Sequence, residues 1–234
     1  MKPRRPRSLA VLRPAPWAMR PEREAWRCLN HCRRAIGDAI VPAPVPVDLW
    51  IEHPLGLDLE ITDLSVLGPG ILGAAYVTER RIAISDTLVE QHGRFRFTCS
   101  HELGHLVLHA DEDVLFRDDA TSILAARSKT IEREADQFAA AFLMPISLLE
   151  SELRRVVGSL DAMRQLGDDG CASTWDHEIL PPLEERFGVS RAAAIVRCAN
   201  LRWRNARPLM AETTREHLLR TRRQPVDEAQ PRLF

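Results

Sequence analysis

The segment HELGH at residues 101–105 constrains this chain most, because it specifies both a helix and a chemistry. The pattern over 94–109 predicts a helix in which His101 and His105, four residues apart, lie one turn apart on one face. Both imidazoles can then reach one ion. Glu102 is rotated by about 100° from His101, so its carboxylate can reach a water at that ion without ligating it. The spacing predicts two zinc ligands and a general base.

A catalytic zinc ion needs a third protein ligand and one position left for water. One metallopeptidase pattern would use Asp111, but Leu108 stands where that pattern has the glycine at which the chain turns. Another pattern takes a glutamate from a second helix. Residues 131–140 predict a strong helix with small side chains that permit close approach. We favour this second source.

Two glutamates of that helix compete for the ion. Glu132 and Glu134 point about 200° apart on a helix, so only one of them can face the metal. Ala135, Asp136 and Ala139 follow Glu132 on one narrow face that can lie against the first helix. We therefore favour Glu132 as the ligand, with Asp136 holding a histidine N–H, and Glu134 is the alternative.

Composition places the chain among ordinary globular proteins. Hydrophobic residues make up 45% and charged residues 28% of 234 residues, and the net charge is -1. No apolar run approaches the roughly 20 residues of a membrane span, and the N-terminus lacks the apolar core of a signal peptide. We expect a cytoplasmic protein without membrane contact. Its five scattered cysteines are expected to be free thiols.

The chain is predicted to have four parts. Residues 1–20 are rich in Pro and Arg and predict a flexible basic arm, residues 21–155 a metallopeptidase domain, residues 156–205 a helical subdomain, and residues 206–234 a flexible tail. The expected fold class is α+β, with a small sheet packed on the HELGH helix. Its other elements are a helix over 21–40, a proline-rich linker at 41–47, a short helix at 48–53, a strand at 57–61 and a hairpin of 71–77 with 81–85.

Three further features have competing interpretations. Cys28 and Cys32, beside His31, could bind a metal, but thiols on an apolar helix face more often pack. His109 continues the histidine series and is expected to pack against the helix. The acidic residues 111–119 lack the spacing of a calcium loop and are expected to form a solvated loop.

The C-terminal part suggests a different function. Residues 183–191 resemble the turn of a helix-turn-helix, with Gly188 ending one helix and Ser190 capping the next, which runs to about Leu201. Several arginines lie in this second helix or just after it: Arg191, Arg197, Arg202 and Arg204. The alternative function is therefore a DNA-binding regulator that contacts DNA through 183–204 and uses the metal domain as a sensor or scaffold. The net charge argues against it.

Residues 94–109, 132–139 and 142–145 together resemble the ImmA/IrrE family of zinc metallo-endopeptidases, and the resemblance covers about residues 40–155. It implies a reduced gluzincin-like fold, Zn²⁺ as the cofactor and Glu132 as the third ligand. Several members cleave helix-turn-helix repressors to switch on mobile-element transfer or a stress response, so the resemblance implies a repressor-like protein substrate. Cys99-Ser100 departs from the usual Leu-Ala and affects packing rather than ligation.

The predicted hairpin would border this site. Its strand near 73–77 would offer a sheet edge on which an extended substrate can pair. Tyr76, the only tyrosine of the chain, could stabilise the oxyanion, although a tyrosine packed at a strand end is the more frequent case.

Overall fold

The computed structural model describes residues 12–110, 122–158 and 172–221, so the acidic residues 111–119 lie outside the description. Its strands are β1 (Leu12–Pro14), β2 (Asp58–Thr62), β3 (Gly73–Tyr76), β4 (Arg81–Ser85) and β5 (Leu201–Trp203). Its α-helices are α1 (Met19–Ala35), α2 (Val47–Glu52), α3 (His92–Leu108), α4 (Ser122–Leu143), α5 (Ile146–Val157), α7 (Ala172–Thr174), α8 (Leu180–Phe187), α9 (Arg191–Ala199) and α10 (Glu212–Thr221). Short 3-10 turns occur at Pro16–Ala18, Ser65–Leu67 and Asp86–Leu88, and a π-helical turn at Trp175–Ile179 joins α7 to α8.

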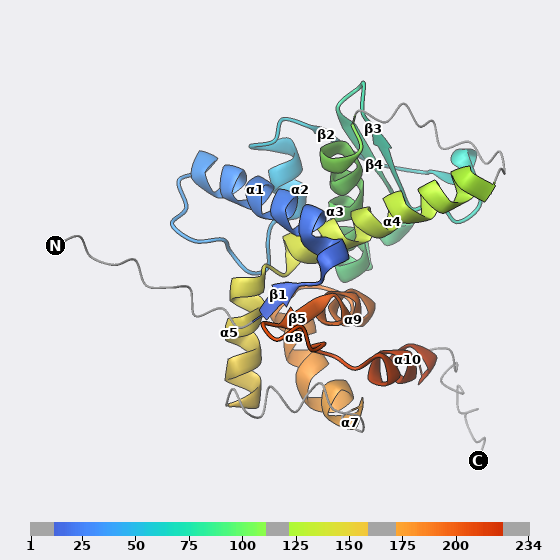
Figure 1. Cartoon of the computed structure of the whole chain (residues 1–234). Coiled ribbons are helices and arrows are strands. Elements are labelled where there is room, and N and C mark those ends of the chain that lie inside the picture. Colours follow the sequence, from blue (N-terminus) through green and yellow to red (C-terminus); the bar gives the residue numbers. More distant parts are fainter. Residues whose placement is uncertain (1–11, 111–121, 159–171, 222–234) are drawn as a thin grey trace, which may run out of the picture.

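A three-stranded mixed sheet lies against α3. The strand order is β2-β4-β3, in which β4 runs parallel to β2 and antiparallel to β3. β4 is the buried centre of this sheet, because Ile82, Ala83 and Ile84 are almost inaccessible to solvent. α3 contacts β3 and β4 on one side and α4 on the other, and α1 and α2 also pack on it (Figure 1).

The elements expected around the HELGH segment are confirmed. The helix expected over 94–109 corresponds to α3, the helix over 131–140 lies inside α4, and the predicted hairpin is β3 and β4. Apolar periodicity and turn residues therefore located these elements to within a few residues. The α+β fold with a small sheet on the HELGH helix is confirmed.

The N-terminal segment differs from the flexible arm expected over 1–20. β1 pairs antiparallel with β5, and Leu12 lies opposite Trp203. α1 begins at Met19, and Ala15 and Ala18 are buried before it. The proline and arginine content suggested disorder, but residues 12–14 pair with a strand about 190 positions further along the chain. The arm prediction is wrong for 12–20, and residues 1–11 lie outside the described part.

The flexible tail expected over 206–234 is likewise wrong for residues 206–221. Leu209 and Met210 are buried, and α10 follows them with Leu218 facing the interior. Leu12 and Leu218 belong to the same hydrophobic core as the residues around α3 and α4. Residues 222–234 lie outside the description. One core thus joins segments from both ends of the described chain.

The helix-turn-helix-like segment is formed as expected, but it packs inside the molecule. α8 ends at Gly188, which has a φ of 59°, and the Ser190 hydroxyl accepts a hydrogen bond from the Ala193 N–H at 3.3 Å. The turn lies on the start of α3. A Cβ at Gly93 would come within 2.8 Å of the Ser190 nitrogen, so a glycine is required there.

The described cysteines are free thiols, as expected. Cys28, Cys32, Cys99 and Cys198 are all buried without disulfides, and Cys171 lies outside the description. Cys28 and Cys32 pack in the hydrophobic core on the inner face of α1. Among the described residues, no helix has the length and apolar character needed to cross a bilayer.

A buried ion pair ties the C-terminal helices to the N-terminal one. The Arg197 side chain of α9 is 2% exposed and contacts both carboxylate oxygens of Glu22 in α1, at 2.5 and 2.9 Å. Its Nε donates a third hydrogen bond to the Met144 carbonyl at 2.8 Å. The guanidinium is therefore buried but paired, as the high cost of an isolated buried charge requires.

We predict that Glu22→Ala destabilises the fold by about 3–5 kcal/mol, because it leaves the Arg197 charge buried and unpaired. For a chain of this size the melting temperature should fall by roughly 6–20 °C in a thermal scan. Glu24→Ala is the matched control, because Glu24 pairs on the same helix with the exposed Arg23 and Arg27. That variant should lose less than about 1 kcal/mol. Equal losses of stability in the two variants would contradict the stabilising role of the Glu22–Arg197 ion pair.

Candidate metal centre

Two histidines of α3 present their ring nitrogens to the same point. His101 and His105 lie one turn apart, and their Nε2 atoms are 3.0 Å from each other. Their ring centroids are 4.8 Å apart, and both side chains are largely buried. The i, i+4 spacing thus places two imidazole nitrogens side by side, as the sequence predicted.

Glu132 of α4 completes the group. One carboxylate oxygen lies 3.2 Å from the Nε2 of His101, and the other lies 3.6 Å from the Nε2 of His105. Zinc bound tetrahedrally at 2.0–2.1 Å would separate its ligand atoms by roughly 3.3 Å. The observed separations of 3.0–3.6 Å lie near that value, with the two Glu132 distances measured to different carboxylate oxygens, so the three side chains are placed to hold one ion. They are the one group of metal-ligand type among the described residues.

Small residues bring the two helices close enough for this convergence. A Cβ at Gly104 would lie 3.3 Å from the Cα of Ala135 and 3.1 Å from Phe138. Because Gly104 has no side chain and Ala135 only a methyl group, the two backbones approach closely beside the ligands. A larger residue at 104 would push α4, and Glu132 with it, away from the histidines.

Asp136 lies one turn after Glu132 and contacts the other nitrogen of His101, at 2.9 Å from Nδ1. This contact leaves Nε2 of His101 directed at the ion position. Burial lowers the pKa of His101, but its hydrogen bonds with Asp136 and Glu132 outweigh burial and raise that pKa to about 10. The hydrogen bonds from both histidines hold the pKa of Glu132 well below its usual range. The group thus favours positive charge at its centre.

Glu102 is 7% exposed, and its carboxylate lies against β3. Burial is the main reason that its pKa is raised above the usual value. A Cβ at Gly73 would come within 2.5 Å of Glu102 Oε1 and 2.7 Å of Thr98 Cγ2. The glycine therefore makes room for the carboxylate beside the sheet edge.

Tyr76 lies at the other end of β3. Its ring is under the Arg81 guanidinium, with the carbon of that group 3.9 Å from the ring centroid. Tyr76 lies three positions after Gly73, which corresponds to about 10 Å along the strand. A catalytic role for Tyr76 stays a prediction.

Sequence reasoning missed the contacts that His109 and Glu134 make beside the metal group. His109 was expected to pack against the helix, but its Nδ1 lies 3.2 Å from Nδ1 of His105 and its Nε2 lies 3.2 Å from Glu134. Glu134, the rejected ligand candidate, thus contacts the metal group through a second histidine. The i, i+4 spacing of His105 and His109 was the only local signal for this contact.

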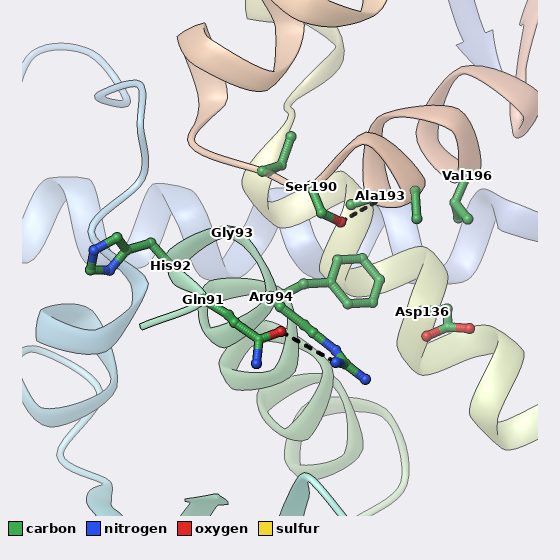
Figure 2. Close-up of a pocket in the computed structure, with 11 residues that line it drawn as sticks. Gln91, His92, Gly93, Arg94, Asp136, Ser190, Ala193 and Val196 are labelled. Atoms are coloured by element: carbon green, nitrogen blue, oxygen red, sulfur yellow. Dashed lines mark hydrogen bonds between the residues drawn. The ribbon is translucent and has the colours of Figure 1, made fainter. Parts of the chain in front are cut away.

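A cleft of about 770 Å³ opens beside the group. Figure 2 shows Gln91 and Arg94 at the start of α3, Asp136 on α4, and Ser190 and the first half of α9 around it. Asp136, which lines the cleft, also contacts His101, so the cleft borders the metal group at this residue. Its floor includes the apolar side chains of Phe97, Val189 and Val196.

Metal binding should be measurable as stability. Zinc at about a thousand times its Kd should add roughly 4 kcal/mol, because it binds only the folded chain. At this chain length that corresponds to roughly 8–16 °C in the melting temperature, measured with zinc and after chelation. His105→Ala should abolish the zinc-dependent shift, whereas His31→Ala, a histidine on α1, should keep it. A full shift in the His105 variant would show that the ion binds elsewhere.

Of the comparisons with known proteins, one family model covers this metal group. No curated protein matches the chain. Among solved structures, it is similar to a Mycobacterium tuberculosis transcriptional regulator at 18% identity with a TM-score of 0.47, over 82% of this chain and 48% of that one. The chain thus spans about half of that regulator. The model of the IrrE N-terminal-like domain, Peptidase M78, matches residues 57–199, which include His101, His105 and Glu132. Because this match covers more than half of the chain, the protein belongs to the Peptidase M78 family of metallopeptidases.

Proposed function

We propose that this protein is a zinc-dependent endopeptidase. The observation that carries the proposal is the convergence of His101, His105 and Glu132 beside the buried carboxylate of Glu102. Two imidazoles and one carboxylate are a donor set that zinc uses in catalytic sites with a position left open. Zinc held there would polarise the scissile carbonyl, lower the pKa of the attacking water and stabilise the oxyanion.

Glu102 and Asp136 have separate tasks in this proposal. The Glu102 carboxylate accepts a proton from the attacking water and delivers it to the nitrogen of the leaving amine. Its pKa is raised chiefly by burial, which makes the carboxylate a stronger proton acceptor than an exposed glutamate. Asp136 accepts the Nδ1–H of His101, so that Nε2 keeps its lone pair for the metal.

The substrate would bind as an extended segment along β3. In the described sheet β3 pairs only with β4, so its other edge is available for backbone hydrogen bonds beside Gly73 and Glu102. The cleft at the start of α3 provides apolar contacts for side chains on one side of the scissile bond. The substrate class follows from the family resemblance, and we propose a helix-turn-helix repressor or an antitoxin-like partner.

The arginine contacts in 183–204 do not favour the alternative of a DNA-binding regulator. Arg197 is buried against Glu22, and Arg191 pairs with Glu184 and Asp176. Arg202 lies over the Trp17 ring at 5.0 Å. Three of the four arginines that suggested phosphate contacts thus already have partners inside the chain.

Glu102→Gln should keep zinc and abolish cleavage, because the amide cannot accept the proton while all three ligands remain. We expect unchanged zinc content by metal analysis and a loss of at least about 100-fold in cleavage of a co-encoded repressor. His101→Ala should lose both zinc and cleavage. Cleavage retained in Glu102→Gln would reject the proposed mechanism.

Gly73→Ala should separate the general base from the metal ligands. The added methyl group would overlap the Glu102 carboxylate and displace it, without contacting the zinc-binding group. We expect kcat to fall by about 100-fold, because a shift of about 1 Å is sufficient for that loss, while zinc affinity is retained. Ala74→Ser is the matched control, since its side chain points to the opposite face of β3. Similar losses in both variants would indicate general damage to the hairpin.

A further inference from the structure

A line of contacts leads from His105 away from the ion position to the surface. The Nε2 of His105 belongs to the metal group, and its Nδ1 lies 3.2 Å from Nδ1 of His109. The Nε2 of His109 lies 3.2 Å from the Glu134 carboxylate. Glu134 in turn accepts from Nη1 of Arg20 at 2.7 Å. Residues of α3, α4 and α1 thus meet in one continuous series.

The direction of each hydrogen bond in this series follows from the chemistry of its two ends. A histidine that binds a metal through Nε2 carries its proton on Nδ1, so His105 must donate to His109. His109 then accepts through Nδ1 and has its own proton on Nε2. That N–H points at the Glu134 carboxylate, which can only accept. One arrangement of protons therefore satisfies every contact, and it is the arrangement that metal binding requires.

Arg20 holds the outer end of the series. Besides contacting Glu134, its Nη2 donates to the Leu108 carbonyl at 2.5 Å. Leu108 is the last residue of α3 and directly precedes His109, so one guanidinium fixes both the carboxylate and the backbone that carries His109. A cation at the C-terminus of a helix is also favoured by the helix dipole.

The side chains that contact the Nδ1 atoms of His101 and His105 differ in their exposure to solvent. Asp136, the partner of His101, has a side chain that is 47% exposed, so water can take its place. The His109 side chain is 4% exposed and that of Glu134 21%. If the His109 imidazole were removed, the Nδ1–H of His105 would lose this acceptor while buried, and the His105 ring would be less restrained.

We propose that His109, Glu134 and Arg20 form a positioning chain that fixes the ring and the tautomer of His105 for metal binding. This inference rests on the metal site proposed above. None of the three side chains would touch the ion or the substrate. Their contribution would be to hold one ligand in the geometry that the ion needs.

The test measures metal binding rather than activity. Zinc affinity is obtained by competition with a chromogenic chelator, and the ligand geometry from the visible absorption of the Co²⁺-substituted protein. His109→Leu and Glu134→Ala should each weaken zinc binding by about 10–100-fold and alter the Co²⁺ spectrum. His109→Gln should recover part of the affinity, because its amide can accept from His105 and donate to Glu134. The double variant should lose little more than the stronger single one, because the contacts act in series.

Two controls separate this inference from its alternatives. Arg133→Ala changes an exposed residue next to Glu134 on α4 and should leave affinity and spectrum unchanged. If His109→Leu does not fold, Glu134→Ala decides, since it removes the acceptor of the His109 N–H while leaving His109 in place. Wild-type affinity and spectrum in the folded His109 and Glu134 variants would overturn the positioning chain while leaving the metal site intact. A wild-type chain that binds no zinc would overturn both.

Discussion

The close packing of α3 on α4 is the constraint on which the site depends. His101 and His105 come from one helix and reach a common point through local geometry alone, but Glu132 belongs to a helix that begins 14 residues after α3 ends. Its carboxylate meets the histidines only because Gly104 and Ala135 let the two backbones approach. The sequence HELGH therefore encodes the proposed ligands and the helix separation together: its histidines face Glu132, and its glycine sets the distance to the helix that carries Glu132.

The sheet imposes a second close approach on the opposite side of α3. Gly73 occupies the point where β3 passes Glu102, and any side chain there would overlap the carboxylate. Glu102, the proposed general base, is therefore enclosed between its own helix and a strand edge, and burial raises its pKa. The same strand has the free edge on which we propose that a substrate aligns. The proposed base and the proposed substrate edge are thereby placed side by side, independently of Glu132 on α4.

Sequence reasoning succeeded where a local pattern carries the information. The spacing of His101, Glu102 and His105, and the 200° separation of Glu132 from Glu134, follow from the geometry of one helix. It failed where the partner lies far along the chain. Leu12 pairs with Trp203, and Arg20 contacts Glu134, but nothing in the proline- and arginine-rich composition around them indicates either contact. A flexible arm is the expectation from composition alone, and tertiary contacts override it.

The choice between Glu132 and Glu134 shows how a correct local argument can still be incomplete. Because the two side chains point in different directions, one of them faces the two Nε2 atoms while the other is free to meet a group further along α3. His109 is that group, one turn beyond His105. Glu132 and Asp136 thus meet His101 on one side of α4, whereas Glu134 meets His109. The geometry that turns Glu134 away from the proposed ion position brings it to His109, which in turn contacts the proposed ligand His105.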